Sequence, residues 1–582
     1  MNAAVLLILS IAILLIGYIF YGRWLSKKWG VDPSKATPAH TMEDGVDYVP
    51  AKAPVLMGHH FSSIAGAGPI NGPIQAAVFG WVPVALWVLI GGIFFGGVHD
   101  FGALFASVRN KGKSIGTVIE DSIGLKAKRL FIIFAYLTLL LVVAAFGSIV
   151  ANTFKATYLE NGAIDYAASA ANASTAMISI FFIVLAILFG FFVYRRNAPL
   201  GVSTIIGVVL IAVAMYVGLN WHPIYLSYET WMIICGVYIL VASVTPVWIL
   251  LQPRDYLSSF LLYGMMIIAI IGILFSGAHV DLPAFAGWGG LNGNASLFPT
   301  LFITVACGAV SGFHSLIGSG TTSKQLDSEK DAKVIGYGAM IVESALAVIA
   351  LIAIGVVFKE TNIGGGEKFL LTAPPTIFAG GVATMVATTF GGVADFSNPV
   401  YDTTYTLLTL AVSVFALTSL DSGTRLARYM FAELFVPEGK TREELTGARK
   451  FFSNPFVSTL IMVVIGCGMG FMGLNQIWGV FGAANQLLAG IAMLAVASWL
   501  GQVGKSNKMF FVPMVFMLAA TGTSLTMTII AKVKLIAGLV ADKTAAWGDW
   551  FQMIWSVGLI VLAVILVIEG VQVLAKPKAK KA

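Results

Sequence analysis

Three histidines in two glycine-rich apolar stretches are the side chains of this sequence best suited to carry a proton or to hold an anion. His59 and His60 lie in residues 58–73, and His314 lies in residues 311–326. Histidine suits either task because its unperturbed pKa, about 6.5, is close to physiological pH. The structural alternative for each is a neutral histidine that bonds an unwound backbone carbonyl. We expect at least one of the three to be functional.

The first of these stretches is apolar enough to enter a membrane, yet it cannot form an unbroken helix. Residues 58–73 contain four glycines and two prolines. Glycine lowers the cost of unwinding a helix, and proline removes a backbone donor and clashes with the preceding turn. In lipid, freed backbone groups need partners, so a broken helix is tolerated only inside protein or beside a water-filled cavity. A broken apolar segment with ionisable groups therefore indicates a transport site.

The second stretch, at the end of an apolar run at 297–320, repeats the pattern of the first. Both have a glycine, a histidine one or two places later, then serine, isoleucine and Gly-x-Gly. The basic loops place an odd number of crossings between the two stretches, which makes them antiparallel. Two such interrupted segments in corresponding halves indicate an inverted-repeat transporter. The alternative, glycines that only allow tight helix packing, explains neither Pro69 and Pro73 nor the histidines.

Composition places most of the chain in a membrane. The 582 residues are 58% hydrophobic and only 11% charged, with a mean hydropathy of +0.88, whereas a soluble domain carries about 25% charged residues. The net charge of +7 is not a nucleic-acid signal, because the basic residues lie in loops between apolar runs long enough to span a bilayer. These runs fall at 4–22, 58–75, 78–98, 129–152, 176–194, 201–219, 230–250, 256–276, 297–320, 335–357, 376–420, 456–474, 478–500, 510–531 and 551–574.

Loops rich in Lys and Arg set the expected orientation, because such loops face the cytoplasm. The loops at 153–175, 220–229 and 277–296 are nearly free of basic residues and should face outward. This alternation puts the N-terminus outside and the C-terminus inside, with about 15 spans. The run at 376–420 must cross an odd number of times, so we expect a re-entrant segment or broken helix, interrupted at Gly391-Gly392 and Pro399, and then one span.

The cysteines show no disulfide pattern, and the first apolar run shows no signal-peptide pattern. Cys235, Cys307 and Cys467 lie far apart within apolar runs, so we expect them to be reduced and buried rather than paired in disulfides. The run at 4–22 has no basic residue before it and no convincing cleavage site after it. We therefore expect a retained helix and not a signal peptide.

The candidate binding residues are the histidines together with short polar and small residues of the two stretches. The polar ones offer donors where the backbone is freed, although capping of a half-helix is the simpler role for any single one. The half-helix N-termini would present positive dipole ends to a carboxylate. The set is His59, His60, Ser62, Ser63, Gly66, Gly68, Asn71, His314, Ser315, Thr321 and Thr322.

A second set of ionisable residues is assigned to coupling or gating. Glu343 lies in the middle of the run at 335–357, where a carboxylate is costly and indicates function by default; the alternative is a hydrogen bond to a neighbouring helix. Asp421 and Arg425, spaced i,i+4, should form an ion pair at a cytoplasmic helix end, and Arg254 with Asp255 should act in the same way, as a gate or anchor. His99 and Asp100 close the run at 78–98, where a solvated carboxylate is the alternative.

Six motifs resemble the carbon starvation protein A family of bacterial inner-membrane transporters. They are GHHFSSIAGAGPINGP at 58–73, FGGVHDFGALFASVRNKGKSIG at 95–116, QPRDYL at 252–257, SGFHSLIGSGTTSKQL at 311–326, GYGAMIVES at 336–344 and LTSLDSGTRLARY at 417–429. The resemblance implies secondary active uptake of peptides or pyruvate during carbon starvation, with the proton as coupling ion. It also implies kinship with the amino acid–polyamine–cation, or LeuT-like, transporters.

The expected fold is therefore an all-α polytopic membrane protein with a LeuT-like inverted-repeat core, two discontinuous helices and extra peripheral helices. We expect a peripheral N-terminal helix at 1–30, a transporter core at 55–420, and C-terminal helices at 421–582 that complete and flank the core. The expected location is the bacterial inner membrane.

The expected partners are a small-molecule substrate (peptide or pyruvate) and membrane lipids, without nucleic acid; the residues set no oligomeric state. No cofactor and no enzymatic activity are expected. Two alternatives stay open, a channel and a membrane protein with a metal site. The metal ligands would be His59, His60, His99, Asp100 and His314, although HExxH and Cys₂His₂ spacings are absent from the sequence.

Overall fold

The chain is almost entirely helical in the computed structural model, which describes residues 1–196, 198–291, 293, 295–361, 363, 373–436, 442–540 and 544–575. Within these residues one short hairpin pairs β1 (Thr157–Tyr158) with β2 (Ile164–Asp165) in antiparallel fashion. The all-α class expected from the sequence is confirmed.

The α-helices follow the apolar runs closely because the polar backbone of a segment in lipid must satisfy its hydrogen bonds internally. In chain order they are α1 (Ala3–Ile16), α2 (Gly22–Trp29), α3 (Pro38–Thr41), α4 (Ala53–Ala65), α5 (Gly68–Ala76), α6 (Trp81–Ile90), α7 (Gly97–Arg109), α8 (Ile115–Ser122), α9 (Leu125–Phe154), α10 (Tyr166–Gly190), α11 (Leu200–Asn220), α12 (Tyr228–Val244), α13 (Leu251–Phe275), α14 (Leu297–Thr304), α15 (Gly312–Gly320), α16 (Ala339–Val356), α17 (Pro374–Thr389), α18 (Pro399–Phe435), α19 (Gly447–Phe452), α20 (Pro455–Gly470), α21 (Leu474–Gln502), α22 (Phe511–Ile536) and α23 (Trp547–Ala575).

Eleven helical stretches of the described chain are long and apolar enough to cross a membrane. Several of them join two α-helices through a π-helical turn, as at Gly17–Tyr21 and Gly91–Gly96. Two shorter apolar helices, α12 and α20, and the two broken stretches account for the remaining apolar runs. The number of crossings expected from the sequence stays a prediction.

The interruption expected within 376–420 is confirmed. Helix α17 ends at Thr389, and Gly391 follows with a left-handed φ of 74°. Helix α18 then starts at Pro399, where the Asn398 side chain accepts a hydrogen bond from the Val400 backbone N–H at 3.0 Å. One unbroken helix of 37 residues follows, as expected for a single span after the interruption.

The apolar runs at 58–75 and 297–320 are both broken helices, as expected. In the first, α4 ends at Ala65, Gly66 adopts a φ of 14° and ψ of −150°, and α5 begins at Gly68. In the second, α14 ends at Thr304 and α15 begins only at Gly312. The residues between the half-helices are therefore free to turn their backbone groups toward side chains of other helices.

The two broken stretches lie against each other in antiparallel directions. Glycine makes the closest approaches, because a Cβ at Gly72 would stand 2.8 Å from the Thr304 carbonyl oxygen and 3.1 Å from the Val305 Cα. Each contact joins an early residue of one stretch to a late residue of the other. The paired residues are Ala51 with Gln325, His60 with Thr322, Gly68 with Cys307, and Gly72 with Thr304.

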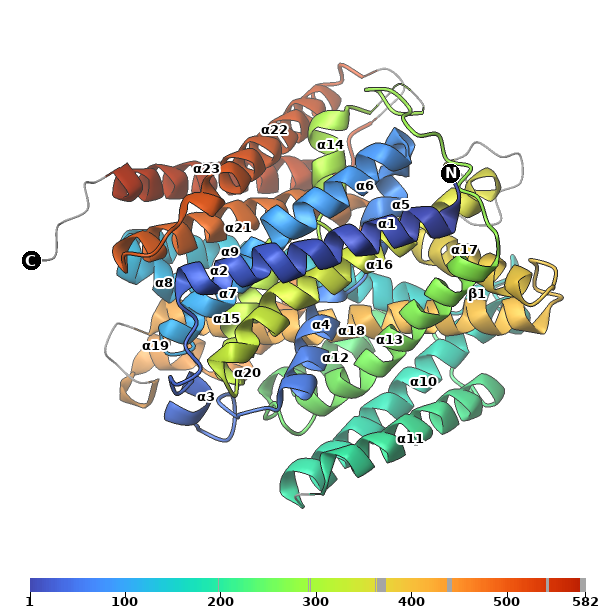
Figure 1. Ribbon diagram of the computed structural model, residues 1–582, viewed down its shortest axis with the longest axis horizontal. Helices are drawn as coiled ribbons and strands as arrows, with labels where there is room; N and C mark the ends of the chain where they lie inside the picture. The colour runs from blue at the N-terminus through green and yellow to red at the C-terminus, as the bar shows by residue number, and fades with distance from the viewer. Residues whose placement is uncertain are drawn as a thin grey trace, which may run out of the picture.

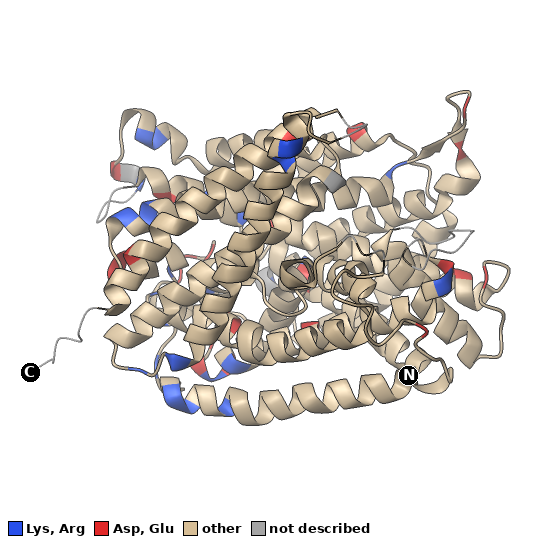
Figure 2. Ribbon diagram, turned by 90° about the horizontal axis from the view of Figure 1, so that it is seen from above, with Lys and Arg blue, Asp and Glu red and all other residues tan. Residues whose placement is uncertain are grey.

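Helices α4 and α15 lie near the middle of the molecule, whereas α14 lies toward the edge formed by α22 (Figure 1). Helices α10 and α11 form one edge of the molecule, and α22 and α23 form the opposite edge. Most Lys and Arg gather toward the end of the molecule opposite the N-terminus (Figure 2). The Met1 carbonyl accepts a hydrogen bond from Val280 N at 2.8 Å, so the N-terminus shares its end with the loop 277–296, as the charge pattern predicts.

Gly72→Ala tests the close approach of the two stretches. The new methyl group would meet backbone atoms of Thr304 and Val305, which cannot give way cheaply, so we expect a loss of about 1–3 kcal/mol in unfolding free energy. The control is Gly264→Ala in α13, where a Cβ meets nothing within 4 Å. That variant should unfold at the wild-type temperature or above, because Ala favours a helix over Gly. Thermal unfolding in detergent followed by tryptophan fluorescence measures both, and equal midpoints for the two variants would contradict the packing.

Candidate functional site

His59 of the first broken stretch is held by a carboxylate from another helix. Its Nδ1 lies 2.8 Å from Oδ2 of Asp255 in α13, and both side chains are completely buried. The other oxygen, Oδ1, accepts hydrogen bonds from Arg254 Nη2 at 2.6 Å and from Arg254 Nε at 3.1 Å. Asp255 therefore joins a histidine of the break to a buried guanidinium.

Arg254 extends this cluster to two further helices. Its Nη1 pairs with Asp421 Oδ2 in α18 and donates a hydrogen bond to the Tyr238 hydroxyl in α12 at 2.7 Å. That hydroxyl in turn donates to Asp421 Oδ2 at 2.7 Å. We call His59, Tyr238, Arg254, Asp255 and Asp421 the arginine cluster. With neutral His59 it carries one cation and two carboxylates, and one proton on His59 brings its net charge to zero.

The expected ion pair between Asp421 and Arg425 is wrong. Asp421 pairs with Arg254, and Arg425 Nη2 donates instead to the carbonyl oxygens of Ala242, at 2.9 Å, and Thr245. Both charged residues are buried within α18 rather than at a helix end. The i,i+4 rule describes exposed helix surfaces, whereas packed neighbours of a buried helix offer partners from all sides.

A second buried cluster surrounds His314 of the other broken stretch. Asp100 in α7 lies between two histidines, with Oδ1 2.7 Å from His99 Nδ1 and Oδ2 2.8 Å from His314 Nδ1. On the far side of its ring, His314 Nε2 lies 3.5 Å from Glu343 Oε2 in α16. Asp100 is 1% exposed, so the solvated carboxylate at a membrane edge is ruled out. We call His99, Asp100, His314 and Glu343 the histidine cluster.

His60 lies between the two clusters. Its Nδ1 is 2.8 Å from the Thr322 hydroxyl of the second stretch, and it interacts electrostatically with Asp100, His314 and His59. Nε2 of His59 and Nε2 of His60 are both buried without a hydrogen-bond partner among the described residues. The three histidines predicted from the sequence therefore meet in one buried region.

The short polar residues of the two stretches divide between cross-helix and local bonds. Ser62 donates to the Asp255 carbonyl at 3.1 Å, and Ser63 donates to Asp255 Oδ2 at 3.4 Å. In contrast, Ser315 and Thr321 donate only to carbonyl oxygens of their own helical turns. Asn71 is buried, and its side-chain oxygen has no partner in the part of the chain that the structure describes.

Three side chains that the sequence motifs do not predict form hydrogen bonds with backbone groups freed by the breaks. Asn485 in α21 accepts a hydrogen bond from the Phe313 N–H at 2.8 Å, and its neighbour Gln486 donates to the Phe302 carbonyl at 3.1 Å. Ser419 in α18 donates to the Ser63 carbonyl at 3.0 Å. Two adjacent amides inside the apolar run at 478–500 were the available signal, because buried side-chain amides need partners.

At the basic end of the molecule the loop residue Asp47 contacts helix α18. Its carboxylate accepts hydrogen bonds from Arg425 Nη1 at 3.3 Å and from the Tyr429 hydroxyl. Burial raises the pKa of Asp47, but the charges of Lys324, Arg425 and Arg428 outweigh burial and leave the pKa below its usual value. Asp47 is therefore ionised throughout the neutral range, and this contact weakens only as the pH falls through that lowered pKa.

The arrangement of the broken helices and buried ion pairs indicates the class of protein. Antiparallel broken helices with buried ion pairs inside an apolar bundle belong to a multi-pass membrane transporter. A mutant of the manganese transporter of Eremococcus coleocola, solved by crystallography, shares this fold with a TM-score of 0.50 and 11% identity, covering 91% of this chain and 99% of that chain. At this identity the likeness speaks to the fold alone.

The chain belongs to the carbon starvation protein CstA family, which it matches over residues 2–364 and 358–524. The peptide transporter CstA of Campylobacter jejuni is 33% identical over 586 residues, covering 89% of this chain and 79% of the relative. The peptide transporter CstA of Escherichia coli is also 33% identical, covering 85% and 76%. The pyruvate/proton symporter BtsT of Escherichia coli is 30% identical, with the same coverage.

Double-mutant cycles test which arginine holds Asp421. Arg254→Gln and Asp421→Asn should couple, because each removes one side of the same buried pair, with an interaction energy of about 1–3 kcal/mol. Arg425→Gln and Asp421→Asn form the matched control and should show a clearly smaller interaction energy, because Arg425 pairs with Asp47 and Asp421 pairs with Arg254. Denaturant unfolding in detergent micelles measures both cycles. Coupling confined to the Arg425 cycle would restore the ion pair expected from the sequence.

Proposed function

We propose that the chain is a proton-coupled secondary transporter that takes up a small carboxylate-bearing substrate, pyruvate or a short peptide, by alternating access. The two substrate classes come from the names of its relatives, peptide transporter CstA and pyruvate/proton symporter BtsT. The family name links this uptake to carbon starvation.

The observation that carries the proposal is the charge balance of the arginine cluster. One guanidinium faces two carboxylates in a region without solvent exposure, and His59 is bonded to one of those carboxylates. An unbalanced buried charge is costly. A proton on His59 removes the imbalance, so the cluster binds one proton when closed and releases it when the helices separate. The coupling role expected for Glu343 passes to His59 in this proposal.

The first break offers a seat for the substrate carboxylate. Helix α5 begins at Gly68, and its first backbone N–H groups and positive dipole end point into the break. Asn71 and the unpartnered Nε2 atoms of His59 and His60 supply polar contacts beside it. A carboxylate is common to pyruvate and to the C-terminus of a peptide, so both classes share this recognition.

The finer architecture is proposed from the same arrangement. The antiparallel stretches support a LeuT-like inverted repeat with about 15 crossings, in which residues 55–420 form the core, 1–30 a peripheral helix, and 421–582 complete and flank the core. Lys and Arg gather at one end of the molecule, which supports a bacterial inner-membrane location with that end in the cytoplasm and the N-terminus outside.

Alternating access is favoured over a channel because two polar networks close the bundle on the basic side of the breaks. The arginine cluster ties α4 to α12, α13 and α18, and the Asp47 contacts close the basic end. A channel needs a continuous polar path. In a transporter, these networks break and reform as the substrate passes.

Counterflow and gradient-driven uptake in proteoliposomes test the function. Vesicles are offered labelled pyruvate or labelled dipeptides, with and without an inward proton gradient. One pH unit is worth about 1.4 kcal/mol per proton, so a one-proton symporter should accumulate substrate roughly tenfold. Equal uptake with and without the proton gradient would exclude proton symport. Uptake of neither substrate would contradict the transport proposal.

His59→Gln tests the coupling residue. The variant keeps a side chain that can hydrogen-bond Asp255 but cannot take the proton, so gradient-driven accumulation should fall to equilibrium while counterflow exchange persists. The matched control is His40→Gln. His40 Nε2 also lies 2.8 Å from a carboxylate, Asp327 Oδ1, but this pair is about half exposed, and accumulation should remain at the wild-type level. Accumulation by His59→Gln equal to that of His40→Gln would rule out His59 as the coupling group.

A further inference from the structure

Three chemically different ligand groups converge at the second break. Cys307 lies between α14 and α15, His314 lies in α15, and Glu343 lies in α16. One ligand atom from each residue lies within 4.8 Å of the ligand atoms of the other two. His314 and Glu343 are completely buried, and Cys307 is 5% exposed. A thiol, an imidazole and a carboxylate thus surround one point in the interior.

Three polar atoms at this point are buried without a hydrogen-bond partner among the described residues. His314 Nε2 and both Glu343 carboxylate oxygens make no hydrogen bond within the described residues. Buried polar atoms are paired in the great majority of cases, and a buried carboxylate without partners is especially costly. His314 Nε2 lies 3.5 Å from Glu343 Oε2, so a single ion bound between the two side chains would satisfy both.

Asp100 prepares His314 for such an ion. Its carboxylate lies 2.8 Å from His314 Nδ1, which favours the proton on Nδ1 and leaves the Nε2 lone pair directed toward Glu343. A carboxylate behind the ligating histidine is a recurring feature of metal sites, where it fixes the ring and its tautomer. His99 holds the other Asp100 oxygen at 2.7 Å, so the support for His314 is itself anchored.

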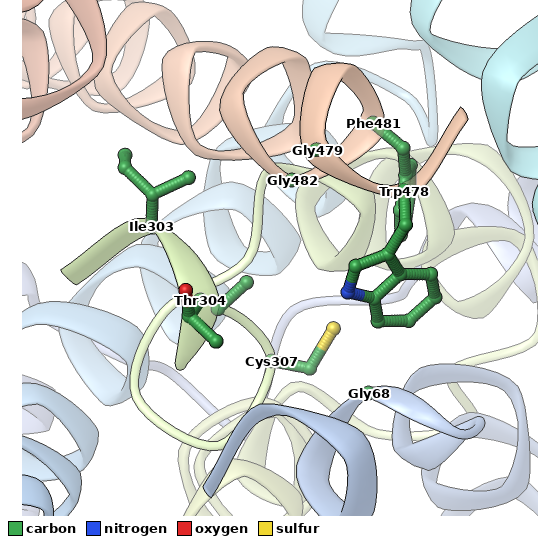
Figure 3. Close-up of a pocket in the computed structure, with 9 residues that line it drawn as sticks. Gly68, Ile303, Thr304, Cys307, Trp478, Gly479, Phe481 and Gly482 are labelled. Atoms are coloured by element: carbon green, nitrogen blue, oxygen red, sulfur yellow. The ribbon is translucent and has the colours of Figure 1, made fainter. Parts of the chain in front are cut away.

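A small cavity leads to the cysteine. It measures about 50 Å³ and lies between α5, the end of α14 and the first turns of α21. Figure 3 shows the Cys307 thiol between Gly68 and the α21 residues Trp478 and Gly482. Gly68 keeps this space open, because a Cβ there would collide with the Cys307 side chain. The volume accommodates a water molecule or an ion.

We propose that Cys307, His314 and Glu343 bind a divalent transition-metal ion of the zinc class, with Cys307 between the ion and this cavity. Sulfur, nitrogen and oxygen together suit such borderline ions and not Mg²⁺ or Ca²⁺, which take oxygen ligands. Zinc–ligand bonds of about 2.0–2.3 Å require the three atoms to draw slightly closer. Cys307 can move because it lies outside regular helix. The bound ion would tie the second break to α16.

Cobalt spectroscopy on the full-length protein tests the site. Purified protein in detergent is stripped with a chelator and titrated with Co²⁺. We expect about one equivalent to bind with tetrahedral ligand-field bands in the visible and a thiolate-to-cobalt charge-transfer band in the near ultraviolet, both displaced by Zn²⁺. Elemental analysis after Zn²⁺ loading should give the same stoichiometry. The absence of a thiolate band in folded wild-type protein would overturn the proposal.

Substitutions assign the ligands. Cys307→Ser should abolish the charge-transfer band, whereas the control Cys467→Ser, at another buried cysteine, should keep it. Glu343→Gln should keep the band but lower the Co²⁺ affinity about tenfold or more. Zn²⁺ should raise the unfolding temperature of wild type and Cys467→Ser but not that of Cys307→Ser. A band that survives Cys307→Ser, or one lost equally in Cys467→Ser, would place the metal elsewhere. None of these readouts depends on transport.

Discussion

A membrane interior offers no water to a freed backbone group, and the rest of this structure depends on how that constraint is met at two broken helices. The first break receives a hydrogen bond from Ser419, and the second is satisfied by Asn485 and Gln486. These donors and acceptors come from α18 and α21, which lie far from the breaks in sequence. The bundle around the breaks is therefore not only a lipid-facing shell; it is what allows the helices to stay unwound.

Once the breaks are held open, charge can be placed beside them. Each broken stretch delivers one histidine to a carboxylate of another helix, His59 to Asp255 and His314 to Asp100. The two pairs have different surroundings. Asp255 is also bonded to Arg254, which connects His59 to a buried ion pair. His314 instead turns its second nitrogen toward Glu343 and Cys307, a setting that suits a metal ion. The two breaks thus place two different sets of ionisable side chains in the interior.

The membrane spans and the helix breaks could be predicted from the sequence, because both depend on residues that are close together in the chain. The glycines and prolines of residues 58–73 predict the first break, and the basic loops predict the antiparallel direction of the two stretches. The ion-pair partners of the buried charged residues could not be predicted in this way, because they come from other helices. Asp421 was assigned to Arg425 by spacing along one helix, whereas its partner Arg254 comes from α13. The sequence predicts only a buried thiol at Cys307, because no neighbouring residue in the chain indicates that Glu343 packs beside it. Contacts between helices depend on packing that periodicity does not encode.

The central claim is that the two broken helices face each other in antiparallel directions. Cross-linking of introduced cysteines tests it most directly, in protein whose native cysteines are replaced by serine. Antiparallel packing places His60 beside Thr322, whereas parallel packing would place it beside a residue before the second break, such as Thr304. The account predicts that Hg²⁺ links cysteines introduced at positions 60 and 322, detected by mass spectrometry of the digested protein, and does not link those at 60 and 304. Linkage of 60 to 304 without linkage of 60 to 322 would contradict it.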